Sequence, residues 1–471
     1  MRSLSLLPIP LVALALGDSV LATDSIPSGQ LHVPLVRRAI AKRTEKEAGE
    51  VARWHKERAE NKFGSGSSIS KRSSGFNLIG NQNSDTNYYG SIAVGTPAVA
   101  YDIILDTGSA DLWLADNNCA DCDTDLVKYD SSASSSFANV SGTFEITYGS
   151  GQASGSLASD IVQLAGMEVN NQVFGVCNTF SSGLVDAPVS GLLGLGWKGI
   201  SSSGATPLWQ TLYESNALDS PLMAFQLTRY QNASNANTLE PGGTFTLGAV
   251  NSSLYTGDID YQDLADSTGY WTVQLSNVSV NGATLDVGSG SASYAIVDTG
   301  TTLVGGPSDQ IAALYAQIPN SAALTGDYDG YYSFPCDTDV SISLSFGGPS
   351  WPIAASDFVF NRLSQSSCVG AFFVFSTSSS SSPQWILGDT FLKNVYSVFR
   401  ASPASVGFAS LSAQALAENG AIGTAPTPTI GSVSASVTGT GDTRLNGAGR
   451  VGAGAWLTAA GAAGALGAVL L

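Results

Sequence analysis

A seven-residue segment that occurs twice constrains this chain more than any other feature of its sequence. Residues 103–109 (IILDTGS) recur, 192 positions later, as residues 295–301 (AIVDTGT). The first copy is followed by Leu-Leu-Gly at 192–194 and the second by Ile-Leu-Gly at 386–388, at intervals of 86 and 88 residues. Two motifs in the same order at nearly the same interval indicate two duplicated lobes, because a period of this length is far too long for a solenoid repeat.

Each copy places an aspartate, Asp106 or Asp298, on a turn directly after an apolar strand. Gly108 and Gly300 follow two residues later, and because they lack a Cβ they allow a sharp turn and a close approach by other groups. A lone Asp-Thr-Gly is ordinary turn chemistry. Two copies on apolar strands, each with the same downstream motif, favour a shared catalytic site over two unrelated turns.

The hydroxyls of Ser109 and Thr301 follow the two aspartates at the same spacing, where they can donate hydrogen bonds to the carboxylates. Two carboxylates brought together cannot both ionise easily, so the pair holds one proton over an acidic pH range. The ionised member can take a proton from water while the neutral member polarises a substrate carbonyl. We therefore predict hydrolysis by Asp106 and Asp298 without a covalent intermediate.

Both histidines of the chain, His32 and His55, lie in its first 72 residues. Residues 73–471 therefore lack the base of Ser–His and Cys–His mechanisms and the ligand of most zinc hydrolase sites. We expect no metal and no cofactor. Residues 73–471 also hold 31 Asp/Glu against 8 Lys/Arg, a net charge of −23, and we expect no nucleic-acid partner.

Short apolar or alternating runs separated by turn residues dominate residues 75–416, which predicts an all-β body. Convincing helical patterns are few, and the best lie at 206–216 and 307–318. The clearest expected strands are 101–105, 143–148, 172–176, 244–247, 270–280 and 341–346.

These motifs resemble those of the pepsin-like aspartic endopeptidases over roughly residues 75–416, and among them the fungal branch that is secreted or GPI-anchored. Residues 106–113 (DTGSADLW) are similar to the first active-site turn of that family and the Trp beyond it, and residues 298–302 (DTGTT) to the second. Residues 146–151 (ITYGSG) resemble the flap, the hairpin that closes over the substrate. Residues 385–389 and 398–399 resemble the strands behind the second turn.

The resemblance implies a bilobal acid protease fold, with an N-terminal lobe at 73–265, a C-terminal lobe at 266–416 and the active site in the cleft between them. It implies that Tyr148 covers the scissile bond and hydrogen-bonds Trp113, rather than serving only as a strand aromatic. One chain supplies both halves of such a site, so a monomer is expected. The implied substrate-binding residues are Gly108, Gly149, Ser150, Gly300 and Thr302.

The N-terminal region is basic, with 12 Lys/Arg and 7 Asp/Glu in residues 1–72. The apolar run at 4–16 is broken by two prolines and too short to span a bilayer, so we predict a signal peptide at 1–22. Residues 23–72 then form a basic propeptide for an acidic cleft, the alternative being a basic tail that binds membrane or nucleic acid. Cleavage is expected after Lys71-Arg72, with Arg37-Arg38 and Lys42-Arg43 as further dibasic sites.

Five cysteines in a secreted chain imply disulfides. For the C-x-x-C of Cys119 and Cys122 a zinc site and a redox motif are alternatives, but there is no second close pair, and the polar loop context favours a disulfide. The family resemblance implies the pairs Cys119–Cys122 and Cys336–Cys368. Cys177 ends an apolar run and is interpreted as a buried free thiol.

The C-terminal 55 residues differ in composition from the body. Residues 417–449 are a Gly/Ser/Thr/Ala/Pro tract without periodicity, interpreted as an extended stalk. Residues 450–471 are uncharged after Arg450, and small residues at 446–448 favour a GPI signal with attachment at Asn446 over a transmembrane helix. The sequons predict N-glycosylation at Asn139, Asn232, Asn251 and Asn277.

The sequence thus predicts an acid-pH aspartic endopeptidase, made as a zymogen whose propeptide inhibits it, acting on protein or peptide substrates. The expected location is the cell surface or extracellular space, through a GPI anchor to plasma membrane or wall. The alternative is a catalytically silent pepsin-like binding glycoprotein, since function lives in sites and not in folds. A third possibility, a structural wall protein, leaves the paired motifs unexplained.

Overall fold

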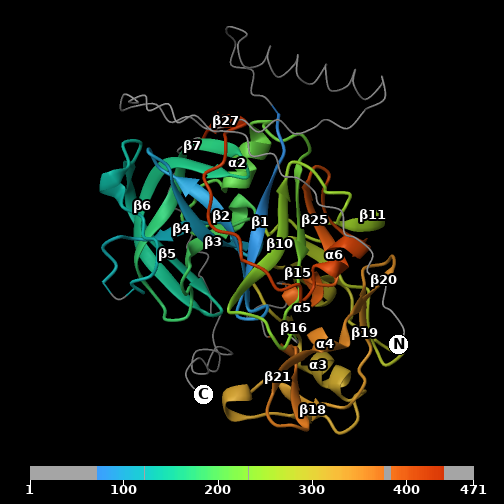
Figure 1. The fold of residues 1–471 in the computed structure, drawn as a ribbon. Helices are drawn as coiled ribbons and strands as arrows, with labels where there is room; N and C mark the ends of the chain where they lie inside the picture. Colours follow the sequence, from blue (N-terminus) through green and yellow to red (C-terminus); the bar gives the residue numbers. More distant parts are fainter. Residues whose placement is uncertain (1–71, 121, 232, 376–382, 440–471) are drawn as a thin grey trace, which may run out of the picture. The chain divides into compact units, whose positions relative to one another are not determined.

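The computed structural model describes residues 72–120, 122–231, 233–375 and 383–439 (Figure 1). The predicted signal peptide, the propeptide up to Lys71, the sequon at Asn232, the attachment residue Asn446 and the tail at 450–471 lie outside the described residues.

The described part of the chain is built mainly of β-strands, as the sequence predicts. The large sheet contains β1 (Gly75–Gln82), β2 (Asn87–Val94), β3 (Val99–Asp106), β4 (Leu112–Ala115), β5 (Ala138–Tyr148), β6 (Gly151–Leu164), β7 (Met167–Phe180), β8 (Val189–Gly194), β9 (Leu222–Leu227), β10 (Leu239–Leu247), β11 (Tyr255–Asp263), β25 (Val395–Ala401), β26 (Ala404–Leu411) and β27 (Ala435–Thr438).

Three smaller sheets and short helices make up most of the rest of the described body. Their strands are β12 (Thr272–Gln274), β13 (Asn277–Val280), β14 (Ala283–Leu285), β15 (Tyr294–Val297), β16 (Val304–Gly306), β17 (Ala322–Ala323), β18 (Tyr332–Pro335), β19 (Ile342–Ser345), β20 (Ser350–Ile353), β21 (Val359–Arg362), β22 (Ser367–Gly370), β23 (Phe372–Val374) and β24 (Trp385–Leu387). The helices are α2 (Leu208–Glu214), α3 (Ser308–Tyr315), α4 (Ala355–Phe358), α5 (Asp389–Leu392) and α6 (Ala413–Ala417), with 3-10 turns η1 (Ser131–Ala133), η2 (Lys198–Ile200), η3 (Gly290–Ser293) and η4 (Gly326–Tyr328).

The sequence duplication is also a duplication of topology. In the first half, β3 pairs in parallel with β8, β8 pairs antiparallel with β4, and β4 pairs in parallel with β7. In the second half, β15, β24, β16 and β23 repeat the same three pairings in the same order. The all-β fold with two duplicated lobes is therefore confirmed, and each Asp-Thr-Gly comes at the end of the first strand of its set.

The large sheet joins the two halves of the chain. Its order begins β11-β26-β25-β9-β10-β1-β2-β3, so the C-terminal strands β25 and β26 lie among strands from the first half. Strand β11, which falls within the predicted N-terminal lobe at 73–265, pairs along its length with β26. A lobe boundary at residue 265 therefore assigns strands of one continuous sheet to both lobes. The predicted strand at 270–280 is likewise two strands, because β12 and β13 enter different sheets.

Large aromatic side chains that are fully buried fill much of the core. Trp113, Trp271 and Trp385 are each 0% exposed, and Trp271 packs between Trp209 and Phe399 at ring-centroid distances of 5.5 and 5.4 Å. Burying an aromatic side chain of this size contributes roughly 2–3 kcal/mol before the entropic cost of ordering it. Trp271 and Trp385 lie next to the strands that carry Asp298, so this packing fixes the backbone under one half of the site.

The segment that we interpreted as the start of a stalk is part of the body. Residues 420–439, here called the strap, leave α6 and run across β10 and β2 to β7, as the red trace in Figure 1 shows. The Gly420 amide donates to the Arg229 carbonyl at 2.8 Å, and β27 pairs in parallel with Met167–Asn170 of β7. A free stalk over 417–439 is therefore incorrect, because the backbone of this stretch is hydrogen-bonded to the sheet.

The cysteines pair as the family resemblance implies. Cys119–Cys122 and Cys336–Cys368 are disulfides, the second of which joins β22 to the end of β18. Cys177 is a free thiol with no exposed surface. Burial raises the pKa of this thiol well above its usual range, so the thiol is unreactive toward ordinary alkylating reagents.

A buried carboxyl in β3 makes stability depend on pH. Asp102 is 5% exposed, and burial raises its pKa to about 7. Between its ordinary pKa and about 7 the folded chain keeps a proton that the unfolded chain releases, so stability falls as pH rises through this window. We expect Asp102→Asn to flatten that fall, which is at most about 4 kcal/mol from this group. Urea unfolding from pH 4 to 7 measures it, and an unchanged slope contradicts it.

Candidate active site

Asp106 and Asp298 occupy equivalent positions in the two lobes. Asp106 is the last residue of β3 and lies beside Gly194 of β8, while Asp298 directly follows β15 and its amide donates to the Leu387 carbonyl of β24 at 3.0 Å. Both strands are apolar and buried, which places each carboxylate at the end of a rigid element. The two residues are 5% and 6% exposed.

Each carboxylate is held by two donors from its own turn. The Gly108 amide donates to Asp106 Oδ1 at 2.8 Å, and Ser109 Oγ donates to Asp106 Oδ2 at 2.5 Å. For the second carboxylate, the Gly300 amide donates to Oδ1 at 2.8 Å and Thr301 Oγ1 donates to Oδ2 at 2.7 Å. These four hydrogen bonds fix the orientation of both carboxylates before any substrate binds.

Each of the two glycines lies against the carboxylate of the opposite lobe. A Cβ on Gly108 would lie 2.5 Å from the Asp298 carboxylate, and a Cβ on Gly300 would lie 2.3 Å from Asp106 Oδ1. Neither contact can be relieved by a flexible side-chain end, because the carboxylates are held from their own turns. Each glycine therefore allows the carboxylate of the opposite lobe to approach.

Two threonines interlock the turns, a role that our reading of the sequence did not assign. Thr107 Oγ1 donates to the Val297 carbonyl at 2.9 Å and accepts from the Thr299 amide at 3.0 Å. In the mirror arrangement, Thr299 Oγ1 donates to the Leu105 carbonyl at 2.6 Å and accepts from the Thr107 amide at 3.1 Å. Both threonines are almost fully buried, so these four bonds tie the lobes together directly beneath the carboxylates.

The pairing of the carboxylates raises the proton affinity of Asp106. Burial is the largest cause and the charge of Asp298 the second, and together they raise the pKa of Asp106 well above its ordinary value. Hydrogen bonds from Ser109 and Gly108 oppose the shift without cancelling it. Because the groups are in contact, the retained proton belongs to the pair. The dyad can therefore hold one neutral and one ionised carboxyl.

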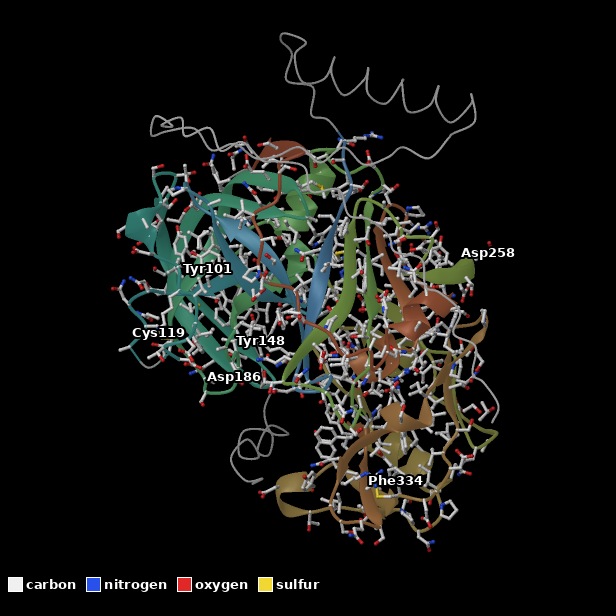
Figure 2. The ribbon with its side chains drawn as sticks, viewed as in Figure 1. Tyr101, Cys119, Tyr148, Asp186, Asp258 and Phe334 are labelled. Carbon is white, nitrogen blue, oxygen red and sulfur yellow. A yellow bond between two sulfur atoms is a disulfide. The ribbon has the colours of Figure 1, made fainter. Side chains whose placement is uncertain are left out.

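A hairpin lies over the first lobe's half of the site. Tyr148 ends β5 and pairs with Gly151 of β6, so Gly149 and Ser150 form an exposed two-residue tip. Trp113 Nε1 donates to the Tyr148 hydroxyl at 2.9 Å, and Tyr148 is labelled in Figure 2. Burial and then the Asp106 carboxylate raise the pKa of Tyr148, so its hydroxyl stays neutral and can act as a donor.

Two residues extend the site beyond the sequence prediction. Burial, then Asp298, then Asp106 raise the pKa of Tyr270, which places its half-buried phenol in the field of both carboxylates. Asp389, at the start of α5, is a buried carboxyl whose Oδ1 has no hydrogen-bond partner among the described residues. Burial raises the pKa of Asp389, and the charge of Lys393 opposes this shift.

The remaining residues that the sequence analysis singled out are Thr302 and the predicted glycosylation sites. Thr302 Oγ1 donates to the carbonyl of Thr86 at 2.9 Å, so this hydroxyl is engaged with the opposite lobe. Asn139 is exposed on β5 and open to glycosylation, while Asn251 and Asn277 are half-buried. Asn251 Oδ1 accepts hydrogen bonds from the amide and hydroxyl of Ser253.

The residues missed at the sequence level carried weak signals. Thr107 and Thr299 stand between Asp and Gly in both copies, so their repetition was visible, but nothing local indicates that they bond across a lobe boundary. Tyr270 has no motif around it, and Asp389 ends the segment 385–389, which resembled the strands behind the second turn but gave no role for its carboxyl.

Removing the Tyr148 hydroxyl tests the hairpin contact. Tyr148→Phe deletes the hydrogen bond from Trp113 and leaves the ring, so we expect kcat/KM for peptide hydrolysis to fall by roughly 2- to 10-fold. The control is Tyr255→Phe, whose ring stacks on Tyr396 at 5.0 Å in β11. Steady-state kinetics of both variants make the comparison, and equal losses contradict a specific role for the Tyr148 hydroxyl.

Comparison with known proteins agrees with this geometry. The model of the family described as eukaryotic aspartyl protease matches residues 87–411. The chain is 43% identical over 352 residues to major aspartyl peptidase 1 of Cryptococcus neoformans var. grubii, covering 72% of each chain. It is 37% identical to an aspartic protease of Phaffia rhodozyma, covering 72% of this chain and 80% of the relative, and 34% identical to pepsin A of Sus scrofa, covering 69% and 81%.

Proposed function

The chain belongs to the eukaryotic aspartyl protease family and is an aspartic endopeptidase, and we propose that it works at acid pH, is made as a zymogen and is held at the cell surface. The interlock of Thr107 with Thr299 is the single observation that carries the catalytic assignment. It fixes the two lobes so that each Asp-Thr-Gly glycine lies against the opposite carboxylate.

The geometry supports a general acid–base reaction at the dyad. A water held between Asp106 and Asp298 gives a proton to the ionised carboxylate as its oxygen attacks the carbonyl carbon of the peptide. The neutral carboxyl donates to the carbonyl oxygen, which produces a tetrahedral diol. The carboxyl that took the water proton then gives it to the amide nitrogen, the C–N bond breaks, and a hydroxyl of the diol returns its proton to the dyad as the carboxylic acid and the amine leave.

Residues around the dyad fit the proposed binding of an extended peptide. Gly108 and Gly300 place no side chain against the opposite carboxylate, where a Cβ would clash. The exposed tip of Gly149 and Ser150 supplies backbone groups over the cleft, and Ser150 offers no carboxylate to a basic side chain. We therefore propose that the preferred peptide bonds are flanked by apolar residues.

Electrostatics support work at acid pH. The raised pKa of Asp106 means that the one-proton dyad is populated at acid pH and is lost as pH rises and both carboxyls ionise. Residues 73–471 carry a net charge of −23, and protonating carboxyls at low pH relieves their repulsion. The Asp102 proton is also lost near pH 7, which lowers stability toward neutrality.

Zymogen processing and anchoring are proposed from charge and composition. The basic leader complements the acidic body, and cleavage after Lys71-Arg72 would leave Ser73 as the first residue. Arg72 is exposed, as a processing site requires. The uncharged stretch 451–471 after the small residues at 446–448 supports GPI attachment at Asn446. Within the described ranges, no helix is long and apolar enough to cross a bilayer.

One assay tests the catalytic proposal. The purified mature protein is incubated with an unfolded protein substrate from pH 3 to 7, with Asp298→Asn as the blank. We expect hydrolysis that is greatest at acid pH, absent near neutrality and inhibited by a pepstatin-type compound. Folded wild-type protein without activity at any of these pH values contradicts the proposal and favours a pepsin-like binding protein. Release by a phosphatidylinositol-specific phospholipase tests the anchor separately.

A further inference from the structure

The strap fixes where the chain leaves the body. The Thr429 amide donates to Ser91 Oγ at 2.8 Å, the Ser434 amide donates to the Gly166 carbonyl at 2.7 Å, and the Gly439 amide donates to the Asn170 carbonyl at 2.7 Å. With the parallel pairing of β27, these bonds secure the chain along most of residues 429–439. The tether to a membrane therefore begins at Gly439, and not at the end of α6.

The remaining tether is short. Only residues 440–445 separate Gly439 from the proposed attachment at Asn446. Fully extended, these seven peptide steps reach about 25 Å, because a residue spans at most roughly 3.6 Å. The end of β27 therefore cannot lie farther than this from the attachment residue, so the chain leaves the body close to its anchor.

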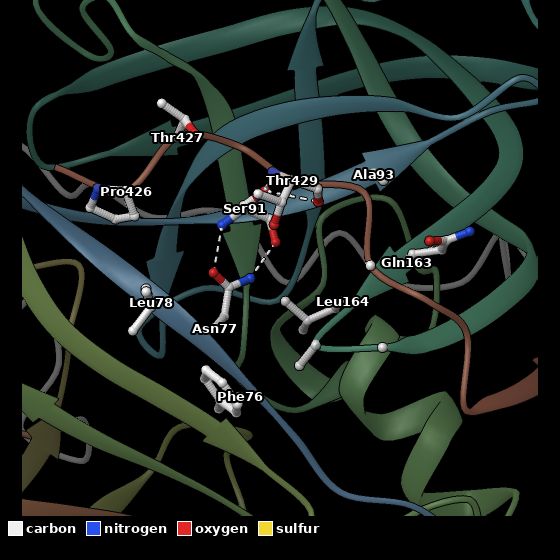
Figure 3. A pocket seen from close by; sticks show the side chains of 13 residues that line it. Phe76, Asn77, Leu78, Ser91, Ala93, Gln163, Leu164, Pro426, Thr427 and Thr429 are labelled. Carbon is white, nitrogen blue, oxygen red and sulfur yellow. Dashed lines mark hydrogen bonds between the residues drawn. The ribbon is translucent and has the colours of Figure 1, made fainter. Parts of the chain in front are cut away.

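Four exposed apolar side chains lie on β1 and on the strap. Phe76 and Leu78 of β1 are 67% and 55% exposed, and Ile430 and Val433 of the strap are 55% and 44% exposed. We call these four residues the strap face. Phe76 and Leu78 line a cavity of about 270 Å³ between β1 and strap residues 426–431, in which Asn77 and Thr429 hydrogen-bond Ser91 (Figure 3). Ile430 and Val433 belong to the same and the adjoining stretch of the strap.

The strap face lacks the charges that would suit an anionic surface. Residues 419–439 contain no Asp, Glu, Lys or Arg. The strap contacts two carboxylates: Glu240 Oε2 accepts from the Gly423 amide at 2.9 Å, and Glu168 Oε1 accepts from Ser436 Oγ at 2.9 Å. The exposed Arg72 lies next to Ser73, whose hydroxyl donates to Ser434 Oγ of the strap. An acidic body with one adjacent cation is not attracted to anionic lipid, which recruits clusters of Lys and Arg. Apolar side chains without charge instead suit the interface of a zwitterionic bilayer.

The catalytic site lies toward the opposite end of the same strand. Strand β7 pairs with β27 at Met167–Asn170, with Trp113 of β4 through Gly175, and with Ala153 near the flap base through Phe180. Ten residues of strand separate Asn170 from Phe180, which is about 33 Å. A membrane beside β27 therefore leaves the flap and cleft directed away from the lipid.

We propose that the strap face lies against the headgroup layer of a zwitterionic phospholipid bilayer, so that the cleft opens away from the membrane. The inference rests on the proposed anchoring at Asn446. Each of the four side chains contributes little by itself, but the short tether keeps them at a high effective concentration beside the lipid. The substrate is then a protein of the surrounding medium or wall, and not the lipid-proximal segment of a membrane protein.

An environment-sensitive fluorophore tests this contact in the full, anchored chain. Ile430→Cys is labelled and compared with Asp309→Cys on the exposed start of α3, both in phosphatidylcholine vesicles. Cys177 is buried and does not take up the dye. We expect a blue-shifted emission at 430, none at 309, and loss of the shift when phospholipase cuts the anchor. Leu78→Cys provides a second probe if the variant at 430 fails to fold.

The outcomes separate this inference from its premises. Anchored, active protein whose emission at 430 and 78 equals that at 309 overturns the inference and leaves the proposed function intact. A shift that needs no lipid and grows with protein concentration overturns it in favour of a second copy of this chain. Protein that phospholipase does not release refutes the anchor on which the inference rests, while hydrolysis of substrate in the same samples reports on the dyad alone.

Discussion

Asparagine at position 298 is expected to lower kcat for peptide hydrolysis by on the order of 10⁴-fold or more. The amide keeps the shape of the carboxylate, its oxygen can still accept the hydrogen bond from the Gly300 amide, and its NH2 group can donate to Thr301 Oγ1 where the carboxylate accepted. It cannot take a proton from water or share one with Asp106. The same loss is expected for Asp106→Asn, because both carboxyls act in one step.

The matched control for this prediction is Asp309→Asn, an exposed aspartate in the same half of the chain. It should retain wild-type kcat, and all three variants should unfold at about the wild-type denaturant concentration. The double variant should be no slower than either single variant, because residues that act as a unit are not additive. A single variant that retains a tenth of wild-type kcat contradicts the dyad.

The dyad was accessible from sequence because its determinants are local. Asp, Gly and the Ser or Thr that orients the carboxylate all lie within four residues, and each turn follows a strand that its own composition identifies. The Thr107–Thr299 interlock was not accessible, since its hydrogen bonds join residues 192 positions apart and depend on the two-fold arrangement of the lobes. Sequence therefore located the carboxylates but not what holds them face to face.

The strap shows a different limit. Its Gly, Ser, Thr and Pro content is typical of extended linkers, and the alternation at 433–437 is too short and too weakly apolar to predict a strand by itself. Residues 435–438 form strand β27 because they pair with the edge of β7 at Met167–Asn170, which supplies hydrogen-bond partners for the backbone of β27. That edge is a tertiary feature that composition does not record.

The predicted boundary between the lobes also missed a tertiary feature, namely the pairing of strands from the two halves. The sequence duplication correctly indicated two lobes, but it could not show that β25 and β26 lie in a sheet with strands of the first half. A cluster of buried charges also joins the two halves of the chain. Lys393 and Asp357 come from the C-terminal half, and Asp85 and Arg229 from the first half.

Lys393→Met is expected to lower the free energy of unfolding by about 3–5 kcal/mol, the usual loss when one partner of a buried ion pair is removed. Lys393 Nζ lies 2.9 Å from Asp85 Oδ2 and 3.4 Å from Asp357 Oδ1, and all three side chains are at most 2% exposed. Arg229 contacts Asp357 through two bonds of 2.6 Å and does not contact Asp85. The substitution therefore leaves the Asp85 charge buried without a cation.

Urea unfolding at pH 5 measures the loss, with Lys198→Met as the matched control. Lys198 is exposed and donates to Thr206 Oγ1, so its replacement should change stability by no more than about 0.5 kcal/mol. Asp85→Asn combined with Lys393→Met should recover part of the loss, because the unpaired charge disappears while the amide can still hydrogen-bond the Tyr230 amide. Equal effects of Lys393→Met and Lys198→Met would show that the cluster does not hold the two halves of the chain together.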